Sequence, residues 1–238
     1  MSEHLLETRN LSISFGGIKA VQDLSFHIDT GEILALIGPN GSGKSTTVNM
    51  ISGVYRQDSG QIFFEGKEID RRMPIAKRTN LGMGRTFQTP KPFGNLTVYE
   101  NIFTIALQGR SFKQADDKAM EILKITGLEP YADVLASKIS IEKRKWIDLA
   151  RILTLDPKLI MMDEVMAGLN PSEMDENLEL VKRINRQGIT ILFIEHVMKA
   201  VVSVCTRSIV LNQGRLLAQG TPEEVLSNPE VIAAYIGG

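Results

Sequence analysis

Gly38-Pro39-Asn40-Gly41-Ser42-Gly43-Lys44-Ser45 is the stretch that decides the fold. It matches the pattern G-x-x-x-x-G-K-S/T, follows the apolar run Ile33 to Ile37, and precedes residues 42–51, which favour a helix that Gly53 can end. At such a junction, backbone N–H groups and the helix N-terminus converge on phosphate oxygens. An ordinary glycine turn with a surface lysine does not account for all of these residues at one place. The stretch therefore predicts a phosphate-binding loop.

Each residue type in this loop has a separate task. Glycines at 38, 41 and 43 allow tight curvature without a Cβ in the way of the anion. Lys44 can reach the outer phosphates, and the Ser45 hydroxyl can ligate magnesium. The nucleotide-binding residues predicted here are Gly38, Pro39, Asn40, Gly41, Ser42, Gly43, Lys44, Ser45 and Thr46.

Two acids follow a second apolar run. Leu159 to Met162 reads as a buried strand, and Asp163 and Glu164 come directly after it. Without a phosphate loop they would read as an exposed acidic pair. Beside such a loop, Asp163 is a candidate for the magnesium shell, and Glu164 can polarise a water that attacks the terminal phosphate.

His196 follows the apolar strand Thr190 to Ile194, at the strand end where ligands gather in open parallel sheets. A lone histidine is more often a surface or capping residue, but this position makes it a candidate for contacting the γ-phosphate. Gln88 lies in a loop, Arg85 to Pro90, and carries little information without the other residues.

The order of elements predicts an α/β fold. Short strands come first, at Leu11 to Phe15, Val21 to Ile28, Ile33 to Ile37 and Gln61 to Phe64, and a helical pattern begins near Thr97. Strands then alternate with helices, which is typical of a parallel sheet covered by helices. No long linker appears, so we expect one unit over residues 1–238, with a helical subdomain inserted at about 95–155.

Composition excludes several classes of protein. Lys and Arg total 27 against 28 Asp and Glu, so the basic character of most nucleic-acid-binding proteins is absent. No apolar run reaches the roughly 20 residues that a membrane-spanning helix needs. The single cysteine, Cys205, cannot form an internal disulfide and lies in an apolar stretch, which fits a buried thiol in a reducing cytoplasm.

These residues, in this order, resemble the ATP-binding subunits of ABC transporters along essentially the whole chain. The resemblance implies ATP and Mg²⁺ as cofactors and an ATPase cycle in which Glu164 activates water and His196 acts as the switch histidine. It assigns Phe15 to stacking on adenine. It also implies that Gln88 links the magnesium to the helical subdomain. This subdomain transmits the conformational change of the ATPase cycle to a membrane permease.

Within that family the chain is most similar to the ATPase subunits of branched-chain amino acid importers. The similarity lies in Gly84 to Gln88, Ala167 to Pro171 and Gly220 to Val225. Importers of urea or amides share much of this pattern and stay an alternative. The resemblance implies a peripheral position on the cytoplasmic face of the membrane, with permease subunits as partners and an extracytoplasmic substrate-binding protein.

One segment departs from the family pattern. Where the family usually has L-S-G-G-Q, this chain has Ile139-Ser140-Ile141-Glu142-Lys143, so Ser140 is kept and both glycines are lost. In the family this signature contacts the ATP of the other subunit. A carboxylate near phosphate and the lost close backbone approach predict a weak contact. We therefore expect a heterodimer with a second ATPase subunit whose signature is intact. Alternatively, Ser140 and the following helix N-terminus suffice for both sites.

Two further hypotheses stay open from the sequence. One is an ABC ATPase that acts on DNA or the ribosome, which the near-neutral charge and the lack of a second ATPase half argue against. The other is a nucleotide-binding subunit with weak hydrolysis outside transport, which the altered signature keeps in view.

Overall fold

The chain forms two β-sheets with helices around them, in a computed structural model that describes residues 4–87 and 89–236. The larger sheet is six-stranded, and its five strands from β9 to β6 are parallel, while β10 is antiparallel to β9. Its order is β10 (Arg215–Gly220), β9 (Arg207–Asn212), β3 (Ile33–Ile37), β8 (Thr190–Ile194), β7 (Leu159–Asp163) and β6 (Met83–Arg85). The smaller, antiparallel sheet is ordered β2 (Ile18–Asp29), β1 (His4–Phe15), β4 (Ser59–Phe64) and β5 (Lys67–Glu68).

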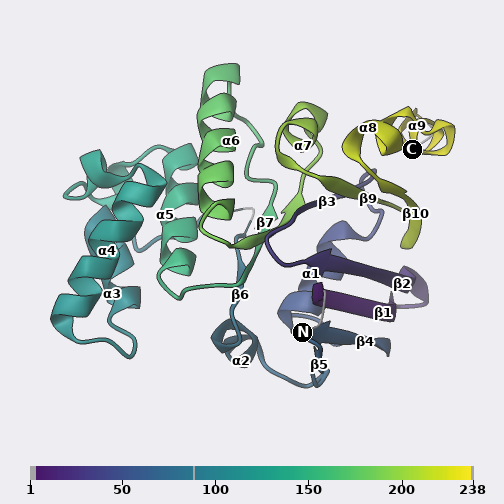
Figure 1. Cartoon of the computed structure of the whole chain (residues 1–238), viewed down its shortest axis with the longest axis horizontal. Coiled ribbons are helices and arrows are strands. Elements are labelled where there is room, and N and C mark those ends of the chain that lie inside the picture. Colours follow the sequence, from purple (N-terminus) through teal and green to yellow (C-terminus); the bar gives the residue numbers. More distant parts are fainter. Residues whose placement is uncertain (1–3, 88, 237–238) are drawn as a thin grey trace.

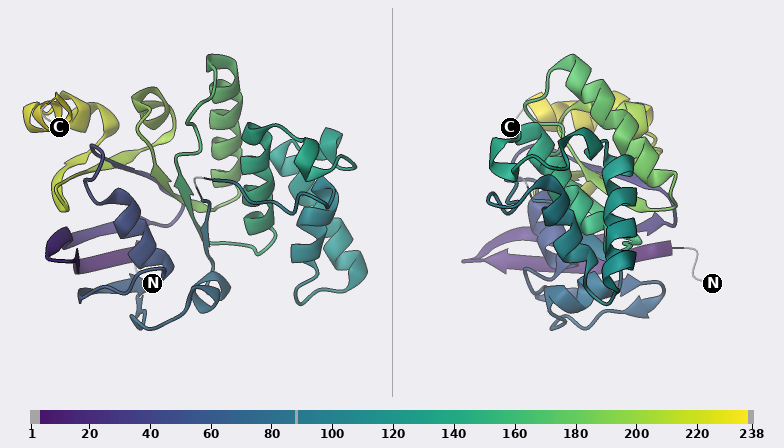
Figure 2. Two further views of the ribbon diagram at one scale, coloured as in Figure 1. Left: turned by 180° about the vertical axis from the view of Figure 1, so that it is seen from behind. Right: turned by 90° about the vertical axis from the view of Figure 1, so that its left-hand side faces the viewer.

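The helices divide between two regions (Figures 1 and 2). Helices α3 to α5 lie together at one side of the molecule, away from the antiparallel sheet. Their bounds are α3 (Val98–Ala106), α4 (Phe112–Thr126) and α5 (Ile141–Leu153). The other helices are α1 (Lys44–Ser52), α2 (Ile75–Asn80), α6 (Pro171–Asn185), α7 (Met198–Val204), α8 (Pro222–Ser227) and α9 (Pro229–Ile236), and two short 3₁₀ turns cover Glu129–Tyr131 and Ala136–Lys138.

Alternate residues of the central strands face two separate cores. On β3, Ile33, Ala35 and Ile37 pack with the helices from α3 to α7, whereas Leu34 and Leu36 pack with α1 and the antiparallel sheet. Because side chains alternate across a strand, a strand that is apolar at every position is buried on both faces. This explains why β3, β7 and β8 read as continuous apolar runs.

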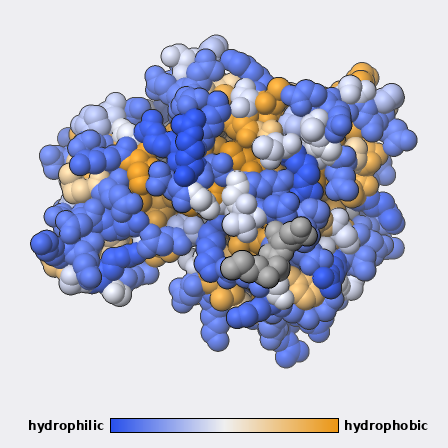
Figure 3. Space-filling view, viewed as in Figure 1, coloured by the Kyte–Doolittle hydropathy of each residue, from blue (hydrophilic) through white to orange (hydrophobic). Residues whose placement is uncertain are grey.

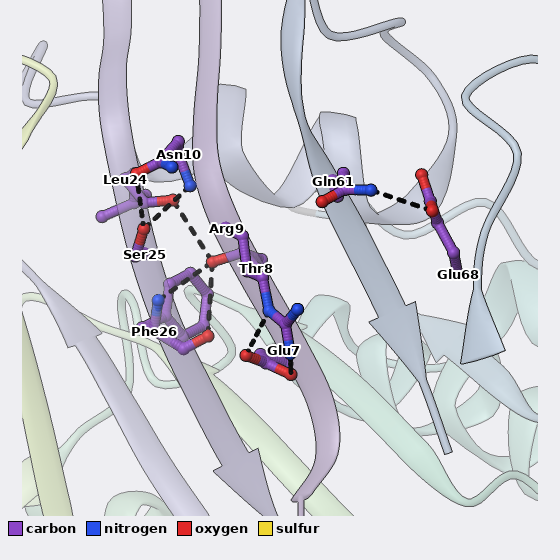
Figure 4. Close-up of polar contacts among 9 residues, drawn as sticks. All are labelled: Glu7, Thr8, Arg9, Asn10, Leu24, Ser25, Phe26, Gln61 and Glu68. Carbon is purple, nitrogen blue, oxygen red and sulfur yellow. Dashed lines mark hydrogen bonds and ion pairs between the residues drawn. The ribbon is translucent and has the colours of Figure 1, made fainter. Parts of the chain in front are cut away.

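Polar contacts hold the antiparallel sheet in register (Figure 4). The buried Thr8 hydroxyl lies within hydrogen-bond distance of the carbonyl oxygens of Leu24 and Phe26, and it accepts a hydrogen bond from the Phe26 N–H at 3.1 Å. Arg9 pairs with Glu7 on the exposed face of the same strand. The sheet therefore presents an apolar face to the α1 core and a polar face outward.

The predicted fold class, an α/β domain with a parallel core and an antiparallel portion, is confirmed. Gly53 ends α1 with a left-handed backbone at φ +85°, as predicted. Thr97 caps α3, near the point where the helical pattern begins. The sequence pattern missed β5, β6, β10 and α2. Among residues 4–87 and 89–236, no helix has the length and apolar character needed to cross a membrane. Figure 3 shows a largely hydrophilic face with apolar residues gathered toward its middle.

Candidate functional site

Two glycines of the phosphate loop, Gly38 and Gly43, sit where no side chain fits. A Cβ on Gly38, at φ +147°, would lie 2.2 Å from the Leu211 carbonyl oxygen, and one on Gly43, at φ +106°, would lie 2.7 Å from the Ala20 carbonyl oxygen. Both positions also have a backbone conformation that other residues rarely adopt. The loop is therefore packed against the end of β9 and the start of β2.

Two buried polar side chains face the inside of this loop. The Lys44 ammonium donates hydrogen bonds to the Gly38 carbonyl at 2.7 Å and to the Pro39 carbonyl at 3.0 Å. Burial lowers the pKa of Lys44, while the nearby Glu164 and Asp163 carboxylates raise it. The Ser42 hydroxyl is buried and has no hydrogen-bond partner among the described residues. A phosphate oxygen would satisfy this hydroxyl, so the residues present fit a bound phosphate.

Asp163 ends β7 next to an arginine from β6. The Arg85 guanidinium donates to the Asp163 carboxylate at 3.1 Å, and the Thr86 hydroxyl lies 3.1 Å from the Asp163 backbone nitrogen. Burial raises the pKa of Asp163, and the Arg85 hydrogen bond opposes that shift. Arg85 also donates to the Asn49 side chain on α1. The arginine thus joins the strand-end acid to the helix that follows the phosphate loop.

Strand register brings the predicted residues to one edge of the sheet. Asp163 on β7 lies opposite Ile194 on β8, and Ile194 lies opposite Leu36 on β3. Parallel strands end at the same edge, so the residues that follow, Glu164, His196 and the loop from Gly38, gather there. The His196 Nδ1 and Glu164 Oε1 atoms are 3.9 Å apart, with 53% of the histidine side chain and 25% of the glutamate side chain exposed.

The other predicted residues differ in how closely they approach this edge. Ser45 is exposed in the first turn of α1, and Thr46 beside it is partly exposed. Of the three predicted metal ligands, the structure describes the side chains of Ser45 and Asp163. Phe15 is 44% exposed at the end of β1 and meets Tyr55 edge to face, with ring centroids 5.2 Å apart. Gln88 lies outside the described residues.

Ser140 is the N-cap residue of α5, and its side chain does not cap the helix. The Ser140 side chain instead lies beside the Glu142 carboxylate, and this contact lowers the pKa of Glu142. The first turn of α5 therefore carries a negative charge close to the serine. This arrangement disfavours the approach of an anion to Ser140.

Sequence reasoning missed two residues that contact the site. No role was predicted for Arg85, although it lies in the motif Gly84 to Gln88. The strand β6 that carries it has three residues, which is too short for a periodicity signal. Tyr235, on α9, lies against the backbone of Gly38, and this contact opposes the rise in the Tyr235 pKa that burial causes. No local pattern signals a contact between residues so far apart in the chain.

The remaining histidines lie on the other sheet. The His4 and His27 rings stack with centroids 3.9 Å apart, and His4 Nδ1 lies 2.5 Å from the Asp29 carboxylate. Candidate ligand atoms of these three residues lie within 4.8 Å of one another, the one such group found in residues 4–87 and 89–236.

Comparison with protein-family models gives two matches. Residues 21–167 match the model described as ABC transporter, and residues 215–238 match the model described as branched-chain amino acid ATP-binding cassette transporter. The first match contains the phosphate loop, Asp163 and Glu164. The second contains β10, α8 and α9.

Similar proteins cover the chain along its whole length. The probable branched-chain amino acid transport ATP-binding protein LivG of Archaeoglobus fulgidus is 36% identical over 98% of this chain and 95% of its own length. The high-affinity branched-chain amino acid transport ATP-binding protein LivG of Escherichia coli K12 is 37% identical over 100% of this chain and 99% of its own. A solved nucleotide-free ATP-binding cassette from an ABC transporter superposes with a TM-score of 0.89 at 33% identity, over 99% of this chain and 100% of that one.

Proposed function

Because this chain belongs to the ABC transporter family of ATP-hydrolysing subunits, we propose that it powers a membrane importer for branched-chain amino acids. One observation carries the catalytic part of the proposal. The parallel strands β3, β7 and β8 bring the phosphate loop, the acids Asp163 and Glu164, and His196 to the same edge of one sheet. That edge combines an anion-binding loop with carboxylates suited to a cation and to general base catalysis.

The residues of this edge have distinct roles in the proposed hydrolysis. Lys44 exchanges its hydrogen bonds to the loop carbonyls for the outer phosphates of ATP, and Ser42 donates to a phosphate oxygen. Ser45 and Asp163 would hold Mg²⁺, which would neutralise charge at the phosphates. Glu164 accepts a proton from the attacking water. His196 lies 3.9 Å from Glu164 and would contact the terminal phosphate. Phe15 would stack on the adenine, and Gln88 would be a further ligand of the metal.

An apolar groove beside this edge fits the permease partner. Two adjoining hollows share Arg85, Phe87, Ile152 and Leu155, and the Phe87 ring is 60% exposed. The groove lies between the strand-rich part of the chain and the helices α3 to α5. These three helices form the proposed subdomain of residues 95–155. We propose that an apolar helix from a permease subunit buries Phe87 there, with the chain at the cytoplasmic face of the membrane. An extracytoplasmic substrate-binding protein would deliver the amino acid.

Mutation of the groove tests this placement. Phe87→Ser should lower the amount of permease that co-purifies with the chain, whereas Val202→Ser, an equally simple change at an exposed valine on α7, should not. Equal recovery of permease with both variants would exclude this groove as the docking site.

The altered signature favours a heterodimer over a homodimer. The Ser140 side chain lies beside the Glu142 carboxylate, so this chain offers a poor second half to a partner's ATP. A second ATPase subunit with an intact signature would complete the site at Gly38 to Ser45. The test replaces the phosphate-loop lysine of one ATPase subunit at a time in the assembled transporter. Lys44→Ala in this chain should abolish ATP turnover. The same change in the partner ATPase should leave partial turnover. Equal losses would exclude the asymmetric arrangement.

Glu164→Gln tests the hydrolytic role. The variant keeps the shape of the side chain and loses the base, so we expect ATP binding within about threefold of wild type and turnover reduced by at least about a hundredfold. Wild-type turnover would remove Glu164 from the base role. Transport assays with leucine, urea and a short amide decide the substrate, because urea or amide uptake without leucine uptake would favour the related importers.

A further inference from the structure

The turn that carries Glu164 is held in an unfavourable backbone conformation. Glu164 has φ +51°, a region that residues other than glycine seldom occupy. Its own N–H donates to the Ile194 carbonyl at 2.9 Å, which ties the turn to the end of β8. A residue in such a conformation persists only where its surroundings fix it. The contacts of the next three residues, Val165 to Ala167, therefore matter for where Glu164 lies.

On one side, this turn is held by a buried acid. Glu195 is 0% exposed, and its Oε1 accepts a hydrogen bond from the Met166 N–H at 2.8 Å. Its second oxygen is also buried and has no hydrogen-bond partner within the described part of the chain. Burial raises the pKa of Glu195, and the Glu164 carboxylate raises it further, while the Met166 N–H and His196 lower it. A buried carboxyl with an unsatisfied oxygen is destabilising, so a purely structural position would favour an apolar residue.

On the other side, the turn is held from the helical region. Lys145, on α5, donates hydrogen bonds to the Ala167 carbonyl at 3.0 Å and the Val165 carbonyl at 3.4 Å. Helix α5 begins directly after Ser140. Lys145 thus connects the start of the signature helix to the residues that follow the proposed catalytic base.

We propose that Glu195 and Lys145 are positioning residues that hold the turn Val165 to Ala167 from opposite sides and so set the place of Glu164 during hydrolysis. Glu195 fixes the turn relative to β8 and His196. Lys145 makes the position of the turn depend on α5, so a displacement of helices α3 to α5 moves the turn. The proposal rests on the proposed function, because it gives Glu164 the role of base.

The test measures ATP turnover of the complete transporter, with its permease and both ATPase subunits, at varied ATP. Glu195→Ala should lower kcat by about tenfold or more and leave KM for ATP within about threefold, because the base is displaced while the phosphate loop is intact. Glu195→Gln keeps an acceptor for the Met166 N–H, so it should restore kcat to within about threefold of wild type. A purely structural role would not give this separation of kcat from KM or this rescue.

Lys145 supplies an independent variant if Glu195→Ala fails to fold. Lys145→Met should lower kcat at constant KM, and Lys145→Arg should recover part of the loss. Lys182→Met, which removes a partly exposed lysine paired with Glu179 on α6, is the matched control and should keep wild-type turnover. Wild-type kcat in both Glu195→Ala and Lys145→Met would overturn the proposal, as would an equal loss in Glu195→Ala and Glu195→Gln.

Glu164→Gln separates this inference from the proposed function. If Glu164→Gln abolishes turnover while Glu195→Ala and Lys145→Met do not change it, the positioning roles fail and the base role stands. If Glu164→Gln keeps wild-type turnover, the base role itself fails, and the positioning proposal fails with it.

Discussion

The Arg85 guanidinium lies 3.1 Å from the Asp163 carboxylate, with 11% and 9% of the two side chains exposed. Arg85 comes from the edge strand β6 and Asp163 from its neighbour β7, in a parallel pair whose register places Arg85 beside Met161. Arg85 also donates to Asn49 on α1. A single side chain therefore connects the edge of the sheet, the proposed metal-binding acid and the helix of the phosphate loop.

Removing this arginine should destabilise the protein and weaken nucleotide binding. Arg85→Met leaves a largely buried carboxylate without its partner, so we expect the free energy of unfolding to fall by about 2–4 kcal/mol. Lys158→Met, which breaks an exposed pair with Glu65, should change it by less than about 1 kcal/mol. Urea unfolding of both variants measures the difference. Similar small effects would show that the Arg85 pair contributes no more than a surface pair.

The phosphate loop should not tolerate a methyl group at Gly38. In Gly38→Ala the Cβ would lie 2.2 Å from a backbone carbonyl, so the loop must move and ATP affinity should fall by at least about tenfold. Gly188→Ala is the control, since Gly188 has φ +85° with open space around it. That change should cost about 1 kcal/mol of stability and leave ATP affinity unchanged. Equal ATP affinity in both variants, measured by calorimetric titration, would contradict the geometry of the loop.

Glu195 should make stability depend on pH in a defined direction. Its pKa is raised in the folded protein, so the folded state holds the proton more tightly than the unfolded state does. The contribution to stability is therefore fully present below the unfolded pKa of about 4.3 and is lost as the pH rises through the folded pKa. Glu195→Gln cannot ionise, so this variant should gain stability relative to wild type as the pH rises from about 4 to 7. Unfolding curves at several pH values test this, and a constant difference between the two proteins would contradict it.

Cys205 should resist alkylation in the folded protein. It is 8% exposed, and burial raises the pKa of its thiol far above the usual range, so little thiolate forms near neutral pH. We expect iodoacetamide at pH 8 to label Cys205 at least about a hundred times faster in urea than in buffer. Mass spectrometry of the intact chain follows the reaction. Complete labelling within minutes in buffer would show that the thiol is accessible.

The sequence predicted the parts of this molecule whose signals are local. The phosphate loop, the buried strands before Asp163 and His196, and the glycine stop of α1 follow from residue types within a few positions of one another. The α/β fold class was predicted from the alternation of such segments. Apolar strands buried on both faces leave a strong pattern, which explains why β3, β7 and β8 were found with nearly correct bounds.

The missed features depend on contacts between distant residues. Strand β6 has three residues, and it is a strand because Gly84 allows it to pack against Ile152 of α5, where a Cβ would lie 2.3 Å from the Ile152 side chain. Without β6, the sequence could not place Arg85 beside Asp163. The Glu195–Met166 hydrogen bond joins two strand ends 29 residues apart and leaves no periodic signal. The predicted site residues, Gln88 among them, stay predictions until they are tested.

ATP-driven uptake tests the central claim most directly. The chain, its partner ATPase and the permease would be reconstituted in vesicles with the substrate-binding protein on the other side of the membrane, and labelled leucine uptake would be measured with ATP present on the side of the ATPase subunits. Uptake should require ATP and be abolished by Glu164→Gln, which still binds ATP. Wild-type uptake in the Glu164→Gln transporter, or uptake that does not depend on ATP, would contradict the account.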